Sequence, residues 1–145
     1  KIPGTVTSLV TTIFIYIAYE HLEYTDIKFS IIFFTLLFFY SFYAVKDAES
    51  EFKNKDPRQI VIDEVLGQAM PLILVLHLSQ NNQLSLQIEI YYVLSFIFFR
   101  FFDILKPFPV SYFDKNFKNY FGIIMDDIMA GLYSMILIYL ISLKF

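Results

Sequence analysis

The chain has no cysteine, two histidines and four glycines in 145 residues, and only 17% of its residues are charged. Without cysteine it has no disulfide framework, no thiolate nucleophile and no cysteine metal site. His21 and His77 occur in no recognisable ligand spacing, which argues against a ferritin-like di-iron bundle. The net charge of −3 and its uneven spread exclude the basic stripe of a nucleic-acid-binding domain, so nucleic acid is not expected as a partner.

Apolar and aromatic residues are abundant instead. Hydrophobic residues make up 57% of the chain and aromatic residues 20%, well above an ordinary soluble domain. Five apolar stretches cover residues 6–19, 27–45, 60–78, 88–105 and 123–143. All but the first approach the roughly 20 residues that an α-helix needs to cross a bilayer. The sequence therefore predicts an all-α fold: a single domain over residues 1–145 that forms a membrane-embedded bundle of about five helices with short interfacial segments.

Proline and glycine indicate where some of these helices begin. Pro3 and Gly4 predict a turn before the first helix. Asp56 and Pro57 predict the N-cap and the first position of the third helix. In the connection that precedes the last helix, a short interfacial helix is expected around residues 112–117.

Charged side chains gather at one end of each of the last three apolar stretches. If these three helices alternate in direction, the three ends lie on the same side of the membrane. Charges in or near the hydrocarbon core are costly and usually mark a functional site. The clustered residues are Asp63, Glu64, Arg100, Asp103, Asp126 and Asp127.

The distribution of positive charge gives the orientation. In the alternating topology, nine of the eleven lysines and arginines fall on the side of the clusters, and Lys28 and Lys144 fall on the other. Lysine and arginine are enriched in the cytoplasmic loops of membrane proteins. We therefore expect the charged clusters to face the cytoplasm.

Asp103 needs a positively charged partner. It lies in the last turn of its predicted helix, against the negative end of the helix dipole. The spacing of Arg100, Asp103 and Lys106 puts neighbouring members on one helix face. Two kinds of partner fit this pattern: a basic side chain, Arg100 or Lys106, in an ion pair, or a divalent cation shared with the other carboxylates.

The two adjacent acidic pairs allow a structural and a functional interpretation. A helix N-terminus favours carboxylates through its dipole alone. This explains Asp63 poorly, because a helix that begins at Pro57 places Asp63 beyond its first turn. Hard oxygen ligands in this number suit Mg²⁺, which carboxylates and substrate phosphate commonly hold, and two such metals would suit in-line attack on phosphorus.

Four motifs, taken together and in this order, resemble the phosphatidylglycerophosphatase A family of bacterial membrane enzymes. They are Pro3-Gly4-Thr5 followed by Ser8-Leu9, residues 60–67, residues 100–109 continuing to Asp114, and residues 122–131. The resemblance implies Mg²⁺-dependent removal of the terminal phosphate from phosphatidylglycerophosphate to give phosphatidylglycerol. It also implies a multi-pass protein of the bacterial inner membrane whose phospholipid substrate stays in the bilayer. Asn119-Tyr120 and Thr7 stand where the family usually carries glycine.

The resulting hypothesis gives each clustered residue a role. Mg²⁺ is held by a subset of the five catalytic carboxylates and activates a water for attack on phosphorus. Either Glu64 or Asp127 takes the proton of that water. Arg100 and Lys106 neutralise phosphate oxygens, and Thr5 adds a hydroxyl or backbone donor. The five carboxylates, which are both metal and catalytic candidates, are Asp63, Glu64, Asp103, Asp126 and Asp127.

Two other functions use the same residues. A transporter or ion-pathway protein would relay protons or cations through buried acids, but it predicts acids spread through the depth of the membrane. Here the acids crowd toward one end. A structural membrane subunit would use the charges only as ion pairs between helices.

Overall fold

The computed structural model describes residues 2–20, 26–51 and 61–144, and over these ranges the chain forms six helices and no strand. This confirms the all-α prediction, with five long helices and one short one. The short helix corresponds to the expected interfacial segment and begins slightly earlier than residue 112. The helices are α1 (Ile2–Glu20), α2 (Ile27–Glu51), α3 (Ile62–Gln80), α4 (Ile88–Leu105), α5 (Val110–Asn116) and α6 (Tyr120–Lys144).

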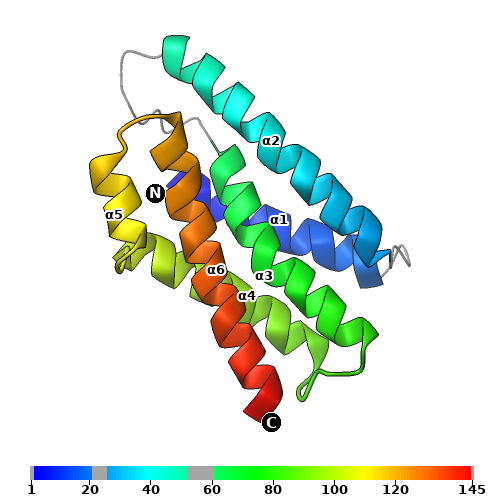
Figure 1. The fold of residues 1–145 in the computed structure, drawn as a ribbon. Coiled ribbons are helices and arrows are strands. Elements are labelled where there is room, and N and C mark those ends of the chain that lie inside the picture. The colour runs from blue at the N-terminus through cyan, green and yellow to red at the C-terminus, as the bar shows by residue number, and fades with distance from the viewer. Residues whose placement is uncertain (1, 21–25, 52–60, 145) are drawn as a thin grey trace.

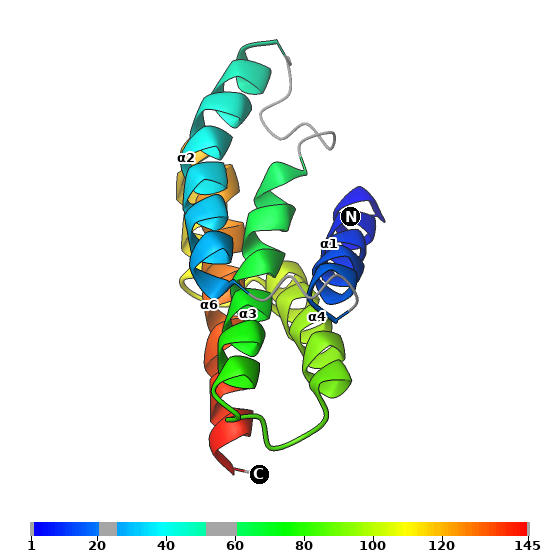
Figure 2. The same cartoon turned by 90° about the vertical axis from the view of Figure 1, so that its right-hand side faces the viewer.

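Helix α3 is the central helix and packs against α1, α2, α4 and α6 (Figures 1 and 2). Its buried residues Leu66, Leu72 and Val75 belong to three separate apolar clusters, each shared with a different set of neighbours. Helices α3 and α6 both begin toward the end of the molecule at which α2 finishes (Figure 1). The first turns of α3 and α6 therefore lie in the same half of the bundle.

Within the described ranges, three helices are long and apolar enough to cross a membrane: Ile27–Ala48, Ile62–Gln80 and Tyr120–Lys144. Helix α4 has the length expected from the sequence but carries three charged residues, Glu89, Arg100 and Asp103. Two of these three lie in its last two turns, where the site described below is formed.

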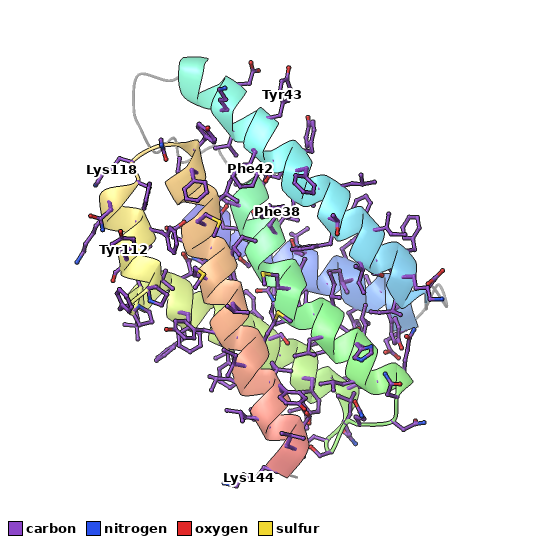
Figure 3. The ribbon with its side chains drawn as sticks, viewed as in Figure 1. Phe38, Phe42, Tyr43, Tyr112, Lys118 and Lys144 are labelled. Atoms are coloured by element: carbon purple, nitrogen blue, oxygen red, sulfur yellow. The ribbon has the colours of Figure 1, made fainter. Side chains whose placement is uncertain are left out.

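The aromatic residues of α2 divide between the bundle and its surroundings. Phe38 and Phe42 pack against the buried cluster that contains Leu66 and Ile124, whereas Tyr43 is 69% exposed on the outer side of α2 (Figure 3). An outer helix face that exposes large aromatic side chains is unusual on a water-soluble monomer. It fits a helix whose outer face contacts lipid.

The beginnings of two helices differ from the sequence-based expectation. The predicted turn at Pro3 and Gly4 is wrong, because both residues lie in the first turn of α1. Proline fits there, since the first N–H groups of a helix have no partner within the helix. Helix α3 begins at Ile62, so the expectation that Asp63 lies beyond the first turn is also wrong. The predicted cap at Asp56 and Pro57 lies outside the described residues.

Two glycines allow the backbones of α3 and α6 to approach closely. A Cβ atom on Gly131 would lie 2.5 Å from the carbonyl oxygen of Gly67. A Cβ atom on Gly67 would lie 2.6 Å from the carbonyl oxygen of Asp127 and would overlap the ring of Phe99. Small residues at a helix crossing permit backbone approach of this kind. The crossing therefore brings the beginning of α6, with its acidic pair, against α3.

Replacement of Gly131 by leucine should destabilise the protein, because the new side chain collides with the α3 backbone. We expect the free energy of unfolding to fall by about 1–3 kcal/mol, the usual cost of overpacking a close contact. Thermal unfolding in detergent micelles measures this loss. The matched control is Leu132→Phe, which adds bulk to the neighbouring side chain, 40% exposed. Equal melting temperatures for the two variants would contradict the assignment of this crossing.

Candidate active site

Three acidic side chains from two helices converge near the beginnings of α3 and α6. Asp63 and Glu64 come from α3 and Asp127 from α6, and one carboxylate oxygen from each lies within 4.8 Å of the other two. Asp63 and Asp127 are buried, with Asp127 only 4% exposed, and Glu64 is half-buried. Like charges so close together and so far from water repel strongly unless a cation or a proton is shared among them.

Two oxygens of this group have no internal partner. Asp63 Oδ1 and Glu64 Oε2 are buried and accept no hydrogen bond from any described residue. A buried carboxylate oxygen without a donor is costly. Together with the separation of the three carboxylates, these two oxygens identify the cluster as a place that suits a cation.

The other two predicted acids lie next to this cluster. Asp127 interacts electrostatically with both Asp103 and Asp126, as well as with the two acids of α3. Asp103 comes from the last turn of α4 and Asp126 from the first two turns of α6. The structure thus brings all five predicted carboxylates into one region, as the alternating topology requires.

Each of these two neighbouring acids has a basic partner. Arg100 Nη1 lies 2.8 Å from Asp103 Oδ2, which settles one of the pairings that the sequence leaves open. Lys106 does not pair with Asp103. Its Nζ lies 2.6 Å from Asp126 Oδ2 and 2.6 Å from Asp114 Oδ1, so it joins the end of α4 to both α5 and α6.

Lys106 also ends helix α4. Lys106 adopts a left-handed conformation with φ of 46° at the end of α4, and its backbone N–H donates to the Phe102 carbonyl oxygen at 2.9 Å. Burial alone would lower the pKa of the Lys106 ammonium. The carboxylates of Asp126 and Asp114 outweigh this effect, and the pKa of Lys106 is raised above its usual range.

Helix α1 closes one side of the cluster. A Cβ atom on Gly4 would overlap the carboxylate of Glu64, so glycine at this position leaves room for that side chain. One turn further, the Ser8 hydroxyl donates to the Gly4 carbonyl oxygen at 2.9 Å and accepts a hydrogen bond from Arg100 Nη1 at 3.5 Å. Thr5 follows Gly4 in the same helix. Its predicted contact with substrate stays a prediction.

Three residues to which the sequence-based hypothesis gives no role lie in or near the site. Ser8 contacts Arg100, and Asp114 contacts Lys106. Gln68 is completely buried, and neither its Nε2 nor its Oε1 has a hydrogen-bond partner among the described residues. One signal for Gln68 was available, because an amide four residues after Glu64 is conspicuous in an otherwise apolar helix. Asp114 could not be placed without the position of α5.

Comparison with known proteins finds relatives that are named for two different lipid phosphatase activities. The chain is 36% identical over 100 residues to phosphatidylglycerophosphatase A of Haemophilus influenzae, covering 69% of this chain and 56% of the relative. It is 40% identical over 84 residues to a Bacteroides thetaiotaomicron protein provisionally named as a phosphatidylinositol-3-phosphatase, covering 58% and 48%. The chain thus spans about half the length of these curated relatives. No solved structure matches it.

A family model gives the more extensive match. The model described as phosphatidylglycerophosphatase A covers residues 1–142, which include all four motifs and every residue of the site described above. The match confirms the resemblance that the motifs indicate. This chain belongs to the phosphatidylglycerophosphatase A family.

Proposed function

We propose that this protein is a membrane lipid phosphatase that removes the terminal phosphate of phosphatidylglycerophosphate and so produces phosphatidylglycerol. Family membership and the name of the Haemophilus influenzae relative support the substrate. The observation that carries the proposal is the convergence of the Asp63, Glu64 and Asp127 carboxylates, since such a group suits a divalent cation of the kind that phosphoryl transfer uses.

The donor set fits Mg²⁺. All three converging side chains supply hard oxygen ligands, and two of them have a buried oxygen that no described residue satisfies. A subset of Asp63, Glu64 and Asp127 would hold the metal, with Asp103 and Asp126 as further candidates beside them, and a carboxylate that does not hold the metal would act as the base. When bound, Mg²⁺ would neutralise phosphate charge and make a coordinated water more acidic.

The remaining groups would bind the phosphate and move the proton. Glu64 is more exposed than Asp127, so it is the better placed of the two to accept a proton from the attacking water. Arg100 and Lys106 already hold Asp103 and Asp126. A phosphate that reaches the site would compete with these acids for the two cations, which would lie against its oxygens. Thr5 would add a hydroxyl or backbone donor from α1.

The apolar outer faces of the helices would let the lipid remain in the bilayer while its headgroup enters the site. Lys118 near α5 and Lys144 at the end of α6 lie at opposite ends of the molecule (Figure 3). In the alternating topology, nine of the eleven basic residues fall on the side of the acidic clusters, so we propose that the active site lies at the cytoplasmic face of a bacterial inner membrane.

Two alternatives have different support. A transporter or ion pathway needs polar groups through the depth of the membrane, whereas the five carboxylates of the site lie near the beginnings of α3 and α6 and the end of α4. A phosphatase acting on phosphatidylinositol 3-phosphate is favoured by the name of the Bacteroides thetaiotaomicron relative. Substrate comparison separates this second alternative from the proposed function.

Purified protein should release inorganic phosphate from phosphatidylglycerophosphate in mixed micelles only when Mg²⁺ is present, because the three converging acids otherwise repel the anionic headgroup. Phosphate release is measured with and without a chelator. Parallel assays with phosphatidylinositol 3-phosphate and phosphatidate give the headgroup preference. Absence of phosphate release from phosphatidylglycerophosphate at any Mg²⁺ concentration would refute the proposed function.

The Asp127→Asn variant should lose metal binding together with activity. We expect phosphate release to fall by about 100-fold or more, since one ligand of the metal is removed. The wild type should gain about 2.7 kcal/mol of stability when Mg²⁺ is 100 times its Kd, and the variant much less. Thermal unfolding with and without Mg²⁺ measures this difference. Glu89→Gln, at an exposed position near the other end of α4, is the control and should behave as the wild type.

The Lys106→Met variant should be less stable by about 1–3 kcal/mol at neutral pH, because Asp114 and Asp126 lose their partner. The folded state holds the Lys106 proton more tightly than the unfolded state. The stabilisation is therefore full below the ordinary lysine pKa of about 10.4 and is lost as the pH rises through the higher folded-state pKa. Unfolding of both proteins between pH 7 and pH 11 tests this, with exposed Lys115→Met as control. A constant difference up to pH 11 would contradict it.

A further inference from the structure

Gln68, on α3, carries a completely buried amide. Its side chain has no exposed surface, and both Nε2 and Oε1 lack a hydrogen-bond partner among the described residues. Several other buried polar side chains bond within their own helices: Ser8 donates to Gly4, Thr12 to Ser8 and Ser95 to Tyr91. Tyr92 Oη and Arg100 Nε also lack a partner among the described residues, but Gln68 alone of these three leaves two polar atoms, a nitrogen and an oxygen, without one. An amide that leaves both donor and acceptor unused is costly. Such a group in a native structure needs an explanation.

The position of Gln68 on α3 places it between two levels of contact with α1. Glu64, four residues earlier, lies against Gly4. Leu72, four residues later, belongs to a cluster that includes Tyr16 of α1. Residues four apart on a helix share a face. Gln68 therefore lies on the face of α3 that α1 covers, one helical turn after Glu64 of the acidic cluster.

The side chain of Gln68 is directed toward that cluster. In an α-helix the Cα–Cβ bond tilts toward the N-terminus, so a side chain covers the turn that precedes it. For Gln68 that turn carries Glu64. Four residues correspond to about 6 Å along the helix axis. The amide thus lies about one turn further along α3 than Glu64, away from the beginning of the helix.

The chemistry of the proposed substrate identifies what lies at this depth. The terminal phosphate at the acids is linked to the acyl chains in the bilayer through the headgroup glycerol and a phosphodiester. The part of the headgroup on the membrane side of the reacting phosphate is therefore the glycerol with its one free hydroxyl. Phosphate and ester oxygens only accept hydrogen bonds. A hydroxyl both donates and accepts, and so satisfies Oε1 and Nε2 of one amide.

We propose that Gln68 binds the free hydroxyl of the headgroup glycerol and selects lipids that carry a polyol between the terminal phosphate and the rest of the molecule. The inference rests on the proposed function and adds a specificity-determining residue to it. A site built to bind a hydroxyl discriminates against an analogue that lacks it, since the amide is then left unpaired.

The test compares two substrates and two proteins. The substrates are phosphatidylglycerophosphate and its deoxy analogue, in which hydrogen replaces the headgroup hydroxyl. The proteins are the wild-type chain and Gln68→Met, which keeps the side-chain volume but has no amide. We expect the wild type to lose about 10- to 100-fold in kcat/KM on the analogue. The variant should hydrolyse both substrates with nearly equal kcat/KM, because the coupling between residue and hydroxyl is gone.

Several outcomes overturn the inference. If the wild type hydrolyses both lipids equally well, an internal water satisfies Gln68 and the inference is wrong. If Gln68→Met still discriminates as the wild type does, another residue binds the hydroxyl. If this variant does not fold, the wild-type comparison alone decides. The control Ser134→Ala removes a buried hydroxyl that bonds within α6 and should keep full discrimination. Absence of phosphate release from either lipid by the wild type would instead refute the proposed function itself.

Discussion

The close crossing of α3 and α6 is the constraint on which the site depends. Gly67 and Gly131 let the two backbones meet, and Asp127 is carried into contact range of Asp63 and Glu64. A water-exposed cluster of three acids would cost little, but buried acids repel one another strongly. The apolar contacts of α3 with its four neighbours must therefore hold together a region whose own charges push it apart. The protein accepts this local cost where its chemistry requires it.

The basic residues compensate for only part of this repulsion. Arg100 pairs with Asp103 inside α4, whereas Lys106 joins three helices through Asp114 and Asp126. These three ion pairs organise the edge of the cluster and leave its centre without a basic partner among the described residues. The pattern separates two kinds of carboxylate that look alike in the sequence: those held by a side chain of the protein and those available to a bound cation. Gly4 and Ser8 complete the arrangement from α1.

Much of the fold could be predicted from the sequence, because stretch length and hydrophobicity are local properties. The convergence of Asp63 with Asp127 also followed, since alternating helix direction puts distant residues at one end. The partners of Lys106 could not be predicted, because Asp114 lies on a short helix whose position depends on tertiary packing. The turn predicted at Pro3 and Gly4 was wrong, because both residues favour turns in general yet are tolerated in a first helical turn. The burial of Gln68 likewise could not be predicted, because it depends on how neighbouring helices pack around α3.

The imbalance of charge at the site bears on the sequence of events in a catalytic cycle. Carboxylates outnumber the two cations Arg100 and Lys106, and the centre of the cluster is the most acidic part. A headgroup whose terminal phosphate is doubly anionic would be repelled by this acidic surface if it approached without a cation. Under the proposed function, a cation would therefore have to be present before the lipid binds or arrive with it, so that substrate binding would depend on the supply of metal. In the same proposal, the excess of carboxylates would also repel the free phosphate that hydrolysis releases.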